Sequence, residues 1–72
     1  MSINTLIEYC RHRGLSFELS YSEAEDTFSI HMHGAGKGED FHARKAGLDL
    51  VIEWAISDAH KYYESLKGNE AA

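Results

Sequence analysis

Two consecutive stretches of alternating apolar and polar residues constrain the fold more than any other feature of the sequence. The apolar positions are Leu15, Phe17, Leu19 and Tyr21 in the first stretch, and Phe28, Ile30 and Met32 in the second. The acidic segment 23–26 separates them. Because successive side chains of a strand point to opposite faces, a period of two indicates half-buried strands. The sequence therefore predicts an antiparallel hairpin with one apolar and one polar face.

A helical pattern precedes the hairpin. Its apolar residues recur at helical spacing and are Ile3, Leu6, Ile7 and Cys10. Thr5 and Glu8 have the spacing of a capping box, and Gly14 suits a left-handed C-terminal cap. We expect a helix from about Asn4 to Arg13.

The second half of the chain predicts one long helix. Glu39 and Asp40 follow the glycine-rich segment 34–38 and suit the positive end of a helix dipole, so the helix is expected from about Phe41 to Leu66. Its core-facing residues would be Leu48, Val51, Ile52, Ala55, Ala59, Tyr62 and Leu66. The prediction is one α+β domain of order α-β-β-α over residues 1–66, with a two-stranded antiparallel hairpin packed on the long helix. Residues 67–72 would form a frayed tail.

Length and composition narrow the class of protein. A chain of 72 residues has room for one core, and domains of this size often need a second subunit, a metal or a disulfide. Cys10 is the only cysteine, so an internal disulfide is excluded. Residues 1–4 lack the features of a signal peptide, and no apolar run is long enough to span a membrane. We expect a cytoplasmic protein. The net charge of −5 disfavours non-specific phosphate binding.

Surplus apolar surface on the long helix predicts a homodimer. A helix of about 26 residues would be about 39 Å long, whereas a strand of about seven residues spans about 23 Å. Leu50, Trp54 and Ile56 point away from its core face. The interface for a second copy or another protein is expected at Leu50, Trp54, Ile56, Tyr62, Tyr63 and Leu66. The open outer edges of the hairpin offer a second route to a dimer, in which two hairpins join into a larger sheet. The alternative to a dimer is that the first helix covers Leu50 and Trp54.

The sequence contains no recognisable catalytic or cofactor-binding motif. We therefore expect a protein that is not an enzyme and binds no cofactor. Cys10 fits a core residue, and segment 34–38 lacks the hydroxyl residue of a phosphate-binding loop. His31 and His33 lie on one face of the second strand, where His42 or Glu18 could add a zinc ligand. Exposed histidines without a metal are the simpler interpretation, so the sequence predicts no metal site.

The run from Leu6 to Leu15 resembles the first helix of double-stranded-RNA-binding domains. Segment 28–32 is similar to that family's second strand. The family's last helix and the glycines before it are similar to Gly36-Lys37-Gly38 and segment 43–50. The family's third strand has no counterpart in the predicted elements. The resemblance implies nucleic-acid binding as the alternative function, through Arg11, Arg13, Lys37, Arg44 and Lys45. Size and acidity are also similar to accessory proteins of bacteriophages and prophages, which often bind one host protein.

Overall fold

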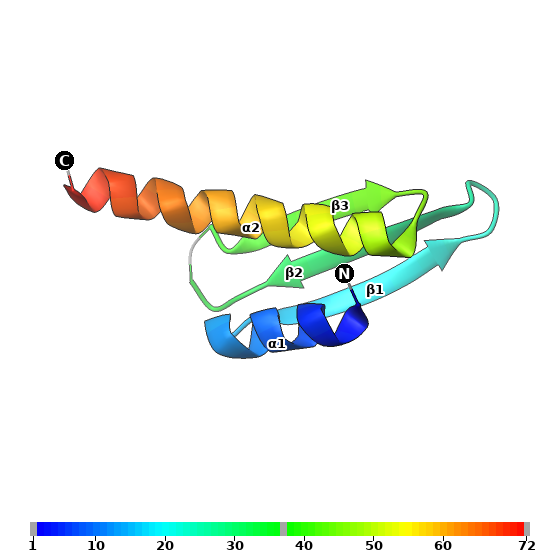
Figure 1. The fold of residues 1–72 in the computed structure, drawn as a ribbon, viewed down its shortest axis with the longest axis horizontal. Helices are drawn as coiled ribbons and strands as arrows, with labels where there is room; N and C mark the ends of the chain where they lie inside the picture. The colour runs from blue at the N-terminus through cyan, green and yellow to red at the C-terminus, as the bar shows by residue number, and fades with distance from the viewer. Residues whose placement is uncertain (1, 37, 72) are drawn as a thin grey trace.

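The computed structural model describes the backbone of residues 2–36 and 38–71, and the side chains of that range up to residue 66. The elements are α1 (Ile3–Arg13), β1 (Ser16–Ser22), β2 (Thr27–His33), β3 (Asp40–Lys45) and α2 (Leu48–Ala71). Within these residues three strands form one antiparallel sheet of order β1-β2-β3. The two helices pack on the same face of this sheet (Figure 1). The α+β class is confirmed, and the order of elements is α-β-β-β-α.

The first helix begins slightly earlier than predicted. Ser2, not Thr5, is its N-terminal cap, because the Thr5 N–H donates to the Ser2 Oγ at 3.4 Å. The helix ends as predicted at Gly14, whose φ of 70° is left-handed. The Leu15 N–H then donates to the Cys10 carbonyl at 2.8 Å, which directs the chain into β1.

The hairpin is confirmed with a regular register. Leu19 of β1 lies opposite Ile30 of β2, and Tyr21 lies opposite Phe28. The turn between the strands contains no glycine, and Asp26 adopts its left-handed conformation with a φ of 53°. Aspartate tolerates this region better than most residues. The Tyr21 hydroxyl donates to the Asp26 carboxylate at 2.8 Å, which ties the turn to β1.

The predicted helix start at Phe41 and the two-stranded sheet are wrong. Asp40–Lys45 forms β3, in which Phe41 is buried while Asp40 and His42 are exposed. This segment alternates with a period of two, and pairing with β2 satisfies its backbone better than an isolated helical turn would. The connection closes where the Gly34 N–H donates to the Glu39 carbonyl at 2.9 Å. The helix α2 starts only after Gly47.

The core lies between the sheet and the two helices. Its buried residues are Leu6, Cys10, Leu15, Ile30, Met32, Phe41, Val51, Ile52, Ala55 and Ala59. Cys10 is confirmed as a core residue, with its Sγ 3.6 Å from the Met32 Sδ, and burial raises the pKa of its thiol. The core is not centred on the hairpin, because α2 packs on β2 and β3. Leu19, in the middle of β1, and Tyr21, near its end, are therefore exposed.

The long helix extends past the end of the sheet (Figure 1). Its predicted core residues Val51, Ile52, Ala55 and Ala59 are buried, which confirms the core-facing side. The helix continues to Ala71, so its predicted end at Leu66 is five residues too early. Of the predicted tail 67–72, residue 72 lies outside the described residues. None of the described helices is long and apolar enough to cross a membrane.

Candidate functional site

The sheet face opposite the helices is polar and open. It carries the alternate residues of each strand, which are Glu18 and Ser20 of β1, Ser29, His31 and His33 of β2, and Asp40, His42 and Arg44 of β3. The register aligns them in rows across the sheet, with Glu18 opposite His31 and His31 opposite His42. A shallow hollow of about 420 Å³ lies over the middle of this face. This concentration of polar side chains makes it a candidate binding surface.

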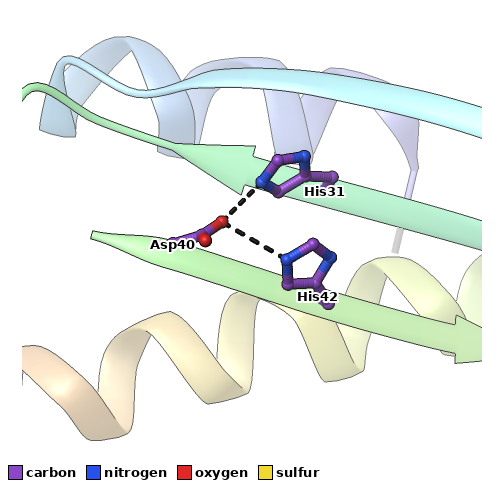
Figure 2. A group of neighbouring side chains, drawn as sticks. All are labelled: His31, Asp40 and His42. Atoms are coloured by element: carbon purple, nitrogen blue, oxygen red, sulfur yellow. Dashed lines mark hydrogen bonds and ion pairs between the residues drawn. The ribbon is translucent and has the colours of Figure 1, made fainter. Parts of the chain in front are cut away.

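His31, Asp40 and His42 form a compact cluster on this face (Figure 2). One Asp40 oxygen, Oδ1, is 2.5 Å from the Nε2 of His31 and 3.3 Å from the Nε2 of His42. The two imidazole rings stack with centroids 4.2 Å apart and an angle of 12° between their planes. Because His31 and His42 are direct cross-strand partners, the backbone of the sheet holds the rings together.

The electrostatics of the cluster favour an ionised carboxylate. The hydrogen bond with His31 lowers the pKa of Asp40, and the charges of His31, His42 and His33 lower it further. Partial desolvation of the carboxyl opposes this effect. The result is an anionic oxygen placed between two imidazole nitrogens. Imidazole and carboxylate together are a donor set that transition metals accept.

The cluster differs from the pair of histidines that the sequence suggested. His33 does lie beside His31, with ring centroids 5.1 Å apart, but His42 is closer and Asp40 was not considered. The sequence placed Asp40 and His42 at the start of a helix and not in a strand. The signal in the sequence is the repeated pattern of His31-Met32-His33 and Asp40-Phe41-His42, in which polar residues flank one apolar residue. Two such segments in neighbouring strands bring their polar residues to one face.

The exposed face of α2 carries two of the residues predicted for a protein interface. Leu50 and Trp54 are 44% and 43% exposed, as expected for residues that point away from the core. The Lys45 Nζ lies 4.2 Å from the centre of the Trp54 ring, in a cation–π contact. Ile56 is partly buried and packs against the core, so it contributes less to this surface than predicted.

Tyr62 and Tyr63, which the sequence places in the expected interface, are only partly exposed. Both rings are partly buried against Phe41, with centroids 5.4 Å and 6.2 Å from its ring. The Tyr63 hydroxyl donates to the Glu39 carboxylate at 2.6 Å, and the Arg13 guanidinium lies 4.4 Å from the centre of the Tyr63 ring. These contacts follow from β3, which places Phe41 under α2. Leu66 was expected on the core-facing side as well as in the interface, and it is 41% exposed, so the core-facing expectation is wrong at this position.

The Tyr63 hydroxyl is expected to stabilise the fold below pH 10 and to lose this effect at higher pH. Burial raises the pKa of Tyr63, and so do the hydrogen bond to Glu39 and its negative charge, whereas Arg13 lowers it. Because the folded state holds this proton more tightly, the stabilisation is present below the ordinary tyrosine pKa of about 10. We expect Tyr63→Phe to cost about 1 kcal/mol at neutral pH in urea unfolding. The difference from wild type should shrink above about pH 10; a difference independent of pH would contradict this account.

The described residues considered for nucleic-acid binding come from α1 and β3. Arg11 pairs with Glu8 at 3.2 Å, and Arg44 pairs with Glu25 at 3.0 Å. Arg13 lies over Tyr63 at the end of α1, and Lys45 lies over Trp54 beside α2. Lys37 lies outside the described residues. The four described residues thus come from the last turn of α1 and from β3, and each contacts another side chain of the same chain.

A function for this chain has to be argued from the geometry of the polar sheet face and of α2, because comparison with known proteins found no match. No protein-family model, no curated protein and no solved structure matches this chain.

Proposed function

We propose that this chain is a small non-enzymatic binding protein that acts through protein–protein contacts as a homodimer. The observation that carries the proposal is the exposure of Leu50 and Trp54 on α2. Both are large apolar side chains on a helix whose opposite side already fills the core. A helix that is apolar on two sides is typically covered on both. Buried tryptophans are also frequent centres of binding energy in protein interfaces.

The spacing of residues on α2 supports helix pairing. Leu50, Trp54, Ser57 and Lys61 follow one another at intervals of four, three and four residues. This is the spacing of the seam along which two helices pack. Glu53, Trp54, Ser57 and Lys61 line a shallow hollow on the surface, so the small Ser57 leaves room beside the indole. We call Leu50, Trp54, Ser57 and Lys61 the outer stripe of α2.

Charge complementarity favours a second copy of the chain as the occupant. Acidic residues, Asp49 and Glu53, flank Leu50 in the sequence, whereas the Lys45 ammonium of β3 lies over the ring of Trp54. In an antiparallel pair related by a two-fold axis, Leu50 of each copy meets Trp54 of the other. The Lys45 ammonium beside each Trp54 then lies near the acidic residues that flank the partner's Leu50, twice over. A parallel pair would place like charges together.

Sedimentation equilibrium tests the proposal with a matched pair of variants. Trp54→Glu should weaken dimerisation about 30-fold or more, because it removes a central aromatic residue and adds a buried charge. Leu19→Glu is the control, since Leu19 is 40% exposed but lies on β1, away from the outer stripe. It should dimerise like the wild type. A wild-type chain that is monomeric at every concentration, or equal weakening by both variants, would refute the proposal.

Nucleic-acid binding is the second candidate, because β3 supplies the third strand that the resemblance to double-stranded-RNA-binding domains implies. The charges support it less well. The β1–β2 turn contains three acidic residues, Glu23, Glu25 and Asp26, and Glu25 already pairs with Arg44. A gel shift with double-stranded RNA discriminates between the two functions. Binding that falls steeply with salt would favour the nucleic-acid function over the protein-binding function.

A further inference from the structure

The polar face of the sheet carries a preformed set of metal-ligand atoms. One ligand atom can be taken from each of His31, Asp40 and His42 such that all three lie within 4.8 Å of one another. They come from neighbouring strands rather than from loops, so the backbone fixes their relative positions. Ligands on regular elements lose little freedom when they bind.

The distances from the Asp40 oxygen to the two imidazole nitrogens lie within about 1 Å of those that a metal ion requires. Tetrahedral coordination with bonds of about 2.0–2.1 Å puts ligand atoms about 3.3–3.4 Å apart. The Asp40 Oδ1 and the His42 Nε2 are already 3.3 Å apart. The Asp40 Oδ1 and the His31 Nε2, at 2.5 Å, must separate by less than about 1 Å. Small side-chain rotations of exposed residues can provide this.

The site is accessible and its surroundings suit a cation. The side chains of His42 and Asp40 are 68% and 62% exposed, so an ion can reach them from solvent. Glu18 lies opposite His31 on β1 and lines the same hollow, which adds a second carboxylate close to the cluster. Three protein ligands leave a fourth coordination position for a water or another small ligand, as in catalytic zinc sites.

We propose that His31, Asp40 and His42 bind a divalent transition-metal ion of the zinc class. Two imidazoles and one carboxylate favour such an ion over Mg²⁺ or Ca²⁺, which prefer oxygen ligands. This site is independent of the proposed dimer, because it lies on the sheet face opposite α2.

Titration calorimetry with zinc chloride tests the site on the full chain at about pH 7.5. The wild type should bind one zinc ion with a micromolar dissociation constant, and magnesium should not compete. His42→Ala should weaken zinc binding by at least about 10-fold. The control is His60→Ala, which removes an exposed histidine on α2 that also lies near a carboxylate, Glu64, at 3.6 Å. Its zinc affinity should stay within about two-fold of wild type.

A second variant separates the loss of a metal ligand from a loss of the folded structure. Asp40→Asn keeps the size of the side chain and its ability to contact the imidazoles, but removes the anionic ligand. It should also weaken zinc binding at least about 10-fold while its circular dichroism stays that of wild type. Cobalt bound to the wild type should give visible absorption bands that His42→Ala lacks. Zinc binding that is absent in the wild type, or that is lost equally in His60→Ala, would overturn the site.

Discussion

Replacing Ile30 with alanine is expected to remove about 2–5 kcal/mol from the free energy of unfolding. Ile30 is 1% exposed and lies in the central strand β2, beneath the helices. The truncation leaves a cavity that a small, closely packed core cannot close. A domain of this length has a total stability of roughly 4–11 kcal/mol, so this loss is a large fraction of it. Urea unfolding followed by circular dichroism measures the loss.

Leu19→Ala is the matched control for this prediction. Leu19 lies directly opposite Ile30 on the same face of the sheet, but it is 40% exposed because the helices do not cover this part of β1. Its truncation should cost less than about 1 kcal/mol. If the two variants lose equal stability, the helices do not lie over β2 and β3 as described.

Phe41→Ala is expected to cost about 3–5 kcal/mol, which tests the third strand. Phe41 is 8% exposed in β3 and packs against the rings of Tyr62 and Tyr63. As the first residue of a helix, outside the core-facing residues that the sequence predicts, it would contribute little. The same urea unfolding experiment therefore distinguishes a strand from a helix at this position.

His42→Ala provides the comparison within the same strand. His42 is the next residue after Phe41 and points to the polar face, where its side chain is 68% exposed. Its replacement should change stability by less than about 1 kcal/mol. A large loss for His42→Ala together with a small loss for Phe41→Ala would show that the faces of β3 are reversed.

The sequence predicts the first helix and the hairpin well, because their periodicities are strong and long. The alternation from Leu15 to Met32 extends over two strands and identifies Ile30 and Met32 as core residues, as the structure confirms. The third strand was missed for a physical reason. Segment 43–46 consists of alanine, arginine and lysine, which are good helix formers, and only pairing with β2 overrides this preference.

The site was harder to predict than the fold, because it depends on that third strand. His31 and His33 could be recognised as neighbours from their spacing alone, whereas the contacts of His42 and Asp40 require the register between β2 and β3. The partial burial of Tyr62 and Tyr63 also follows from β3, which brings Phe41 against their rings. Without β3, nothing covers Tyr63, and its hydrogen bond to Glu39 is not apparent. Leu50 and Trp54, in contrast, depend only on the helical period of α2, and the structure exposes both.

The most direct test of the proposed homodimer is an isotope-filtered nuclear Overhauser experiment on a mixture of labelled and unlabelled chains. Such a sample reports only contacts between two copies of the chain. We predict cross-peaks from the Trp54 indole of one copy to the Leu50 methyl groups of the other. Contacts from Leu19 and Tyr21 of β1 in their place, or the absence of any intermolecular contact at concentrations where the chain sediments as a dimer, would contradict the account.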